Sequence, residues 1–200
     1  MNKILIMAAD AMMAAVGAST QHRQGDISIQ PRVGVSFATL TNTDDSKMKA
    51  NLAYGAEYEQ FVADQFSLAG GILFTNQGTK YTDVSDATLN VYYFAVPITA
   101  NYYVLPGLAV KAGVQPAYRV KTNMKMNGQK YDVDKIIDFL FNDSDVKMSK
   151  FDLSIPVGLS FEYNRVTLDA RYNFGVTKLF TGIDDTTRNQ VITITLGYKM

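Results

Sequence analysis

Residues 151–163, FDLSIPVGLSFEY, alternate between apolar and polar side chains without a break. The odd-numbered positions are apolar from Phe151 to Tyr163, and the even-numbered positions carry Asp, Ser, Pro, Gly or Glu. A period of two is typical of a β-strand with one apolar face, whereas a helix repeats every 3.6 residues. This segment therefore predicts a strand about twice as long as the ~5–6 residues that are usual in globular proteins.

The same alternation recurs along the chain and predicts eight strands, at residues 29–39, 51–61, 66–75, 89–102, 108–121, 151–163, 166–177 and 191–200. Only 89–102 is apolar on both faces, so its phase stays open. The connections alternate between short turns and long polar loops, the loops being 40–50, 76–88, 122–150 and 178–190. Strands of ~9–11 residues cross a bilayer, and this sorting of turns and loops is typical of outer-membrane barrels.

Composition excludes several functional classes. The 200 residues are 47% hydrophobic and carry 19 basic and 19 acidic side chains, so neither a disordered chain nor a basic field for nucleic acid is expected. Because the chain has no Cys and a single His, it cannot form a disulfide framework, a cysteine-ligated zinc site or a multi-histidine metal site. We expect no cofactor, no metal and no nucleic-acid partner.

The first twenty residues have the layout of a cleavable secretory signal peptide. Lys3 supplies the positive region, residues 4–16 are apolar apart from Asp10, and small residues follow. The alternative is an amphipathic N-terminal helix of a cytosolic protein. We interpret 1–20 as the signal peptide and 21–200 as the barrel domain.

Charged side chains lie on the polar faces of the strands. A Lys or Arg facing lipid at the bilayer midplane costs ~2–4 kcal/mol, so in a membrane these charges must line the barrel interior and neutralise one another. A soluble lipocalin-like barrel would instead turn its apolar face inward. The predicted interior charge network consists of Glu57, Glu59, Lys111, Arg119, Lys121, Asp152, Glu162, Asp169, Arg171 and Lys199. Seven glycines on the same faces are expected to leave room for these long side chains.

Tyrosines near strand ends suit the aromatic girdles of a membrane barrel: Tyr54, Tyr58, Tyr102, Tyr103, Tyr118, Tyr163 and Tyr198. The alternative is that they reflect β-propensity alone. Pro97, Pro116 and Pro156 fall within predicted strands and remove ladder donors. We expect them to mark bulges or strand portions beyond the bilayer.

Three segments carry a family resemblance: VYYFAVPITANYYVLPGLAVKAGVQPAYRV, FDLSIPVGLSFEYNRVTLDARYNFGVTKLF and the closing ITITLGYKM. They resemble the small porin-family, PorT-like outer-membrane β-barrels of Gram-negative bacteria, with matches at Asp152, Pro156, Gly158, Arg171, Tyr172, Gly175, Gly197 and Tyr198. The resemblance implies an all-β, eight-stranded antiparallel up-and-down transmembrane barrel in the cell outer membrane, with structural rather than catalytic motifs. It departs from the aromatic terminus usual in such barrels, because the chain ends in Met200.

Few residues offer chemistry. His22 precedes every predicted strand, so we interpret it as a solvated N-terminal residue rather than a catalytic base. Glu57 and Glu59 could act as an acid–base pair, but partnership with interior bases is the favoured interpretation. Asp143 and Asp145 could bind calcium, although a solvated loop is favoured because further ligands are lacking.

The third long loop, 122–150, contains an apolar patch with helical spacing, formed by Ile136, Ile137, Leu140 and Phe141. It could cap the barrel mouth as a short helix, extend a hairpin above the membrane, or bind an extracellular partner. Other expected partners are outer-membrane lipid and lipopolysaccharide and the barrel assembly machinery.

Four functional hypotheses follow. The leading one is a non-enzymatic outer-membrane barrel with a polar, charge-paired interior and long extracellular loops, in a structural or interaction role. A narrow porin-like channel or transporter is the alternative. A soluble lipocalin-like carrier of an apolar ligand and a membrane enzyme are weaker. An eight-stranded barrel is filled by its own side chains, so bulk diffusion of solutes is not expected.

Overall fold

The computed structural model describes residues 22–40, 46–77, 79–81, 87–126, 129–132, 147–177, 180–181 and 189–200. The predicted signal peptide, the apolar loop patch at Ile136, Ile137, Leu140 and Phe141, and the acidic run at 143–145 lie outside these residues. Within the described ranges, no helix has the length and apolar character needed to cross a membrane.

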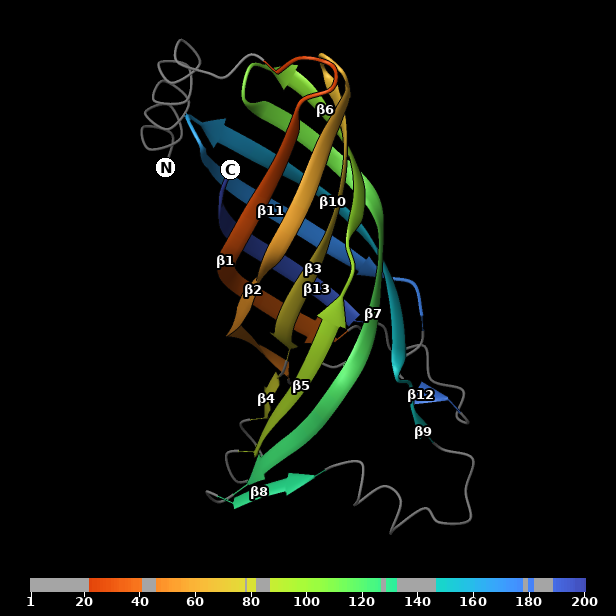
Figure 1. Cartoon of the computed structure of the whole chain (residues 1–200). Coiled ribbons are helices and arrows are strands. Elements are labelled where there is room, and N and C mark those ends of the chain that lie inside the picture. The colour runs from red at the N-terminus through yellow and green to blue at the C-terminus, as the bar shows by residue number, and fades with distance from the viewer. Residues whose placement is uncertain are drawn as a thin grey trace, which may run out of the picture.

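The chain forms a closed, eight-stranded antiparallel β-barrel, as predicted (Figure 1). Strands β4 and β6 continue the barrel positions of β3 and β5, and the pairings of β1 with β13 and of β7 with β10 complete the closed wall. Two-stranded pairing of β9 with β12 adds a small separate ribbon. The bounds are β1 Ile27–Leu40, β2 Ser46–Ala63, β3 Phe66–Gln77, β4 Thr79–Tyr81, β5 Ala87–Ala95, β6 Ile98–Leu105, β7 Leu108–Met126, β8 Gln129–Asp132, β9 Lys147–Met148, β10 Phe151–Tyr163, β11 Val166–Gly175, β12 Phe180–Thr181 and β13 Asn189–Tyr198.

One end of the barrel, the short-turn end, carries the tight turns β2–β3, β6–β7 and β10–β11 (Figure 1). Gly107 has a φ of 78° directly after Pro106, the combination that a type II turn requires. Asn164 has a φ of 55° in the two-residue turn before Arg165, where a left-handed residue suits a hairpin. We call the opposite end, where β4 and β8 lie, the long-loop end.

The apolar faces point outward and the polar faces line the barrel interior. Leu159 and Leu168 are 54% and 44% exposed, whereas Arg171 and Glu162, one position out of phase, are 6% and 4% exposed. This confirms the predicted polar-in, apolar-out arrangement. A lipocalin-like carrier needs an apolar interior, so that alternative is wrong.

Strands β5 and β6 settle the phase of 89–102, because Val91, Tyr93, Thr99 and Asn101 are all buried. Pro97 separates the two strands without reversing the phase. The β7–β10 ladder keeps one register across both Pro116 and Pro156. These two prolines therefore do not mark bulges, contrary to that part of the prediction.

A bulge in β7 places Lys121 outside the barrel. The register against β5 shifts by one residue between the pair Tyr93–Arg119 and the pair Tyr92–Lys121. Beyond this shift Thr122 is buried and Lys121 is exposed. The prediction of Lys121 as an interior charge is therefore wrong, because uninterrupted alternation cannot anticipate an inserted residue.

Most interior glycines make room for the backbone of the neighbouring strand, whereas Gly197 makes room for the long side chain of Arg32, whose Cγ atom would lie 3.2 Å from an added Cβ. A Cβ atom built at Gly34 or Gly113 would collide with the carbonyl oxygen of Ile194 or Ile98 on the adjacent strand. Such close approach is how glycine allows a sheet to curve into a narrow barrel. The prediction that the glycines leave room for long interior side chains therefore holds at Gly197, whereas at Gly34 and Gly113 the close neighbour is the backbone of the adjacent strand.

Candidate functional site

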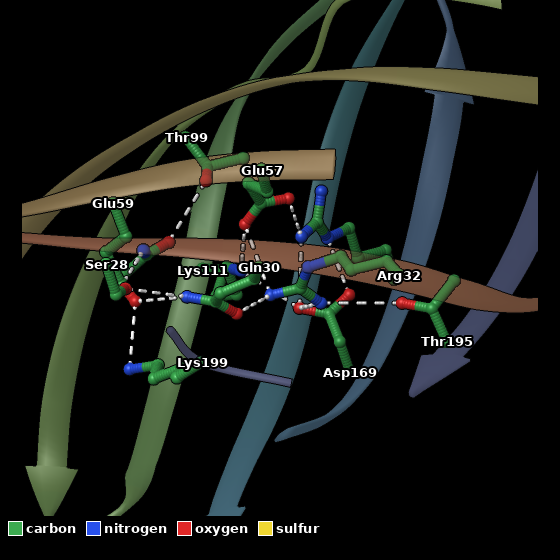
Figure 2. A network of polar contacts seen from close by, with 12 residues as sticks. Ser28, Gln30, Arg32, Glu57, Glu59, Thr99, Lys111, Asp169, Thr195 and Lys199 are labelled. Atoms are coloured by element: carbon green, nitrogen blue, oxygen red, sulfur yellow. Dashed lines mark hydrogen bonds and ion pairs between the residues drawn. The ribbon is translucent and has the colours of Figure 1, made fainter. Parts of the chain in front are cut away.

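Five charged residues from four strands meet in the middle of the barrel, and we call them the central cluster (Figure 2). The strands β1, β2, β7 and β11 each place a charge on their inward face. The members are Arg32, Glu57, Lys111, Asp169 and Arg171, all of them buried. The alternation of side chains along each strand places these residues on the inner face. Closure of the barrel then brings Glu57 of β2 into contact with Arg171 of β11 across the interior.

Both carboxylates of the central cluster are shared by the three cations. The Lys111 Nζ atom lies 3.0 Å from Glu57 Oε1 and 2.9 Å from Asp169 Oδ2. Arg171 contacts Glu57 Oε2 at 2.5 Å through one terminal nitrogen and Asp169 Oδ1 at 2.6 Å through Nε. Arg32 lies 3.3 Å from Glu57 and 3.4 Å from Asp169. Every charge in the cluster therefore has at least two opposite partners.

A second group of charges, the terminal cluster, lies toward the short-turn end and consists of Glu59, Glu162 and Lys199. The Lys199 Nζ atom lies 3.0 Å from Glu59 and 2.6 Å from Glu162. Neutral side chains complete the coordination of Glu59, which accepts hydrogen bonds from Gln30, Ser67, Asn101 and Tyr103. Gln30 also accepts a 2.7 Å hydrogen bond from Arg32, which joins the two clusters.

His22 lies against the interior side chains at the short-turn end of the barrel. Its ring stacks on Phe61 at 4.1 Å between centroids, and its Nε2 lies 2.9 Å from Glu162 Oε2. The backbone amides of Gly25 and Phe61 bond to the carbonyls of Phe61 and Asp26, which fastens the segment over the barrel end. The His22 side chain is only 12% exposed, so its interpretation as a solvated residue is wrong.

The sequence offered no signal for this capping role, because the contact joins residues 140 positions apart. The prediction of Tyr103 as an outer girdle residue is also wrong, because Tyr103 is buried and its hydroxyl donates a 2.9 Å hydrogen bond to Glu59. The other six predicted girdle tyrosines are 42–52% exposed on the outer face.

The two remaining predicted interior charges lie nearer the long-loop end. Arg119 is buried and donates to the Thr122 hydroxyl at 2.6 Å and to the Ser149 carbonyl at 3.2 Å. Asp152 is half-buried and accepts a 2.6 Å hydrogen bond from Thr177. Neither residue belongs to the central or the terminal cluster.

Together the two clusters place balanced charge inside the barrel. Four cations, Arg32, Lys111, Arg171 and Lys199, face four carboxylates, Glu57, Glu59, Glu162 and Asp169. The cavity left beside the central cluster measures about 10 Å³, roughly the volume that one water molecule needs. The arrangement is therefore a plug held by ion pairs.

The same pairing bears on catalysis. Glu57 and Glu59 are each held by cations, so neither is poised as half of an acid–base pair. Among the residues whose positions are described, no three His, Asp or Glu side chains converge in a way that could hold a metal ion. The chemistry that the site supports best is structural ion pairing.

Comparison with known proteins agrees with this architecture. The family model described as "Outer membrane protein beta-barrel domain" matches residues 18–181. Ail, the attachment invasion locus protein of Yersinia pestis, is similar in fold: 17% identity, a TM-score of 0.52, and coverage of 88% of this chain and 99% of that one. Neisserial surface protein A gives 12% identity, a TM-score of 0.54 and coverage of 87% and 97%. A search of curated protein sequences finds no significant match.

Proposed function

Since this chain belongs to the outer membrane protein β-barrel domain family and lies in the outer membrane, we propose that it is a non-enzymatic barrel whose closed interior serves stability and whose extracellular end serves interaction. The narrower similarity to PorT-like barrels stays a prediction within this proposal. In this family the short turns face the periplasm and the longer connections face outward. The long-loop end is accordingly the extracellular end.

The observation that carries the proposal is the central cluster. Its five side chains connect opposite walls of the barrel and leave a cavity of about 10 Å³. A hydrated solute would have to separate ion pairs of 2.5–3.4 Å between buried groups. Separating a buried pair leaves charges without compensation, which is strongly unfavourable.

The extended strands support an interaction role at the extracellular end. Strand β7 has 19 residues and β2 has 18, whereas ~9–11 residues of tilted strand cross the bilayer. The apolar outer face of β7 ends at Val120, and Lys121 and Asn123 follow on the same side. The remaining length supplies a raised sheet beyond the hydrocarbon on which a partner can bind.

Planar-bilayer recording tests the proposal. We expect the wild-type barrel to show no stable, large conductance, because the central cluster fills its interior. The variant Arg171→Ala should then lower barrel stability, whereas a change in ion selectivity would show that Arg171 lines a pore. A steady wild-type conductance with selectivity set by Arg171 would overturn the closed barrel and favour a narrow channel.

A further inference from the structure

An open hollow of about 950 Å³ lies at the short-turn end of the barrel. Three pieces of chain enclose it: residues 22–24, the β2–β3 turn with residues 63–65, and the β6–β7 turn with residues 103–107. We call it the periplasmic pocket, because this end of the barrel faces the periplasm. Its volume lies within the range of about 300–1,000 Å³ that is usual for sites that hold a small molecule.

The deepest side chains of the periplasmic pocket are held in place from below. His22 and Tyr103 line it, and each is bonded to a carboxylate of the terminal cluster: His22 Nε2 lies 2.9 Å from Glu162, and the Tyr103 hydroxyl lies 2.9 Å from Glu59. The Tyr103 amide also donates a 2.9 Å hydrogen bond to the Gln65 carbonyl. A ligand would therefore meet a preformed surface, which lowers the entropic cost of binding.

Two exposed side chains of opposite charge, Arg23 and Asp64, line the same pocket. The Gln24 amide donates a 3.0 Å hydrogen bond to Asp64 Oδ1, which holds the two charged residues on adjoining segments. Within the part of the chain that the structure describes, neither the Arg23 guanidinium nor the Asp64 carboxylate takes part in an ion pair. Both charges are therefore available to a ligand.

An apolar surface lies beside these charges. Ala63, Leu105 and Pro106 line the pocket, and the Leu105 side chain is 51% exposed. A pocket with a few polar groups on an apolar wall is the usual form of a small-molecule site. The complementary ligand carries one ammonium group, one carboxylate and small apolar groups.

We propose that the periplasmic pocket binds the peptide stems of the cell-wall murein. These stems carry the ammonium group of a diamino acid, free carboxylates and the methyl groups of alanine. The planar Arg23 guanidinium can donate two parallel hydrogen bonds to a carboxylate, and Asp64 can accept from the ammonium group. Leu105 and Pro106 then contact the alanine methyl groups. Binding of this kind would attach the outer membrane to the wall beneath it.

A phospholipid head group, which also carries both charges, fits this geometry less well. Lipid head groups lie beside the outer wall of a barrel, whereas this pocket reaches His22 and Tyr103, which contact the interior clusters. The inference rests on the outer-membrane location and on the periplasmic orientation of the short turns. It is independent of whether the interior conducts.

Calorimetric titration of the full barrel, folded in a zwitterionic detergent, tests the proposal. The probes are a tetrapeptide stem released from murein, the same stem with its amine acetylated, the same stem with its carboxylates amidated, and a short-chain phosphatidylethanolamine. The test variant is Arg23→Gln with Asp64→Asn. The matched control, Arg165→Gln with Asp26→Asn, removes the same two charges from exposed positions at this end that lie outside the periplasmic pocket.

We expect the test variant to bind the stem roughly 25-fold more weakly, at about fivefold per charge, and the control to bind as wild type does. Acetylation or amidation should each weaken wild-type binding by about fivefold. The proposal is overturned if wild type does not bind the stem, if both variants bind it alike, or if only phosphatidylethanolamine binding depends on Arg23 and Asp64. Should the double variant fail to fold, the single variants carry the same test at fivefold each. None of these outcomes bears on the closed interior, which bilayer recording tests separately.

Discussion

Replacing Glu57 with Gln removes one of the two carboxylates that hold the central cluster together. The Glu57 side chain lies 2.5 Å from Arg171, 3.0 Å from Lys111 and 3.3 Å from Arg32. At an effective dielectric constant of ~20, a pair of charges 3 Å apart attracts by about 5 kcal/mol before desolvation is subtracted. Without Glu57, three buried cations share Asp169 alone.

The net cost of removing one partner from a buried ion-pair network is about 3–5 kcal/mol of unfolding free energy. We expect Glu57→Gln to lie at the lower end of this range, because the amide oxygen still accepts a hydrogen bond. The matched control is Asp64→Asn at an exposed turn position, where the amide oxygen can still accept from the Gln24 backbone. This change should stay within about 0.5 kcal/mol.

The assay is reversible unfolding by guanidinium in lipid vesicles. The folded fraction is measured from gel mobility, which differs between the folded and the unfolded barrel, because the chain has no Trp whose fluorescence could report unfolding. Adding Lys111→Met to Glu57→Gln should recover part of the loss, because it removes one of the uncompensated cations. Equal stability losses for Glu57→Gln and Asp64→Asn would refute the view that these ion pairs stabilise the barrel.

Three further predictions concern the barrel wall and the short-turn end. Gly113→Ala should lower the free energy of unfolding by about 1–3 kcal/mol, because the added Cβ would collide with the neighbouring backbone. Gly70→Ala is the control and should not lower it, because a Cβ there meets nothing within 4 Å. Equal unfolding midpoints for the two variants would contradict this prediction. Leu159→Arg should cost up to about 2–4 kcal/mol in vesicles by placing a charge in lipid, and an unchanged midpoint would count against lipid contact. His22→Ala should lower the free energy of unfolding by about 1–2 kcal/mol and speed proteolysis of residues 22–26, because it removes the stacking on Phe61. Unchanged stability and proteolysis would show that this contact contributes nothing.

The period-two pattern predicts most of the fold, because every strand of the barrel has one face toward lipid and the other toward a polar interior. Strand β10 runs over Phe151–Tyr163 as predicted. Nine of the ten predicted interior charges lie on inward positions for the same reason. Lys121 is the exception, because a single inserted residue reverses the phase and leaves no local signature.

Contacts that depend on register or on chain closure could not be predicted. The capping by His22 joins residues far apart, and nothing near His22 in the sequence resembles a strand. The sequence could therefore predict which residues face inward, but not which of them meet.

Lipid accessibility of alternate residues along β10 tests the central claim most directly. Because the chain has no Cys, a spin label can be attached through a single introduced cysteine at Leu159 or at Ser160. In bilayers, a label at 159 should be relaxed strongly by oxygen dissolved in the hydrocarbon, and a label at 160 should be shielded. The reverse order, with oxygen reaching 160 and shielding at 159, would contradict an apolar face in lipid and a charged interior.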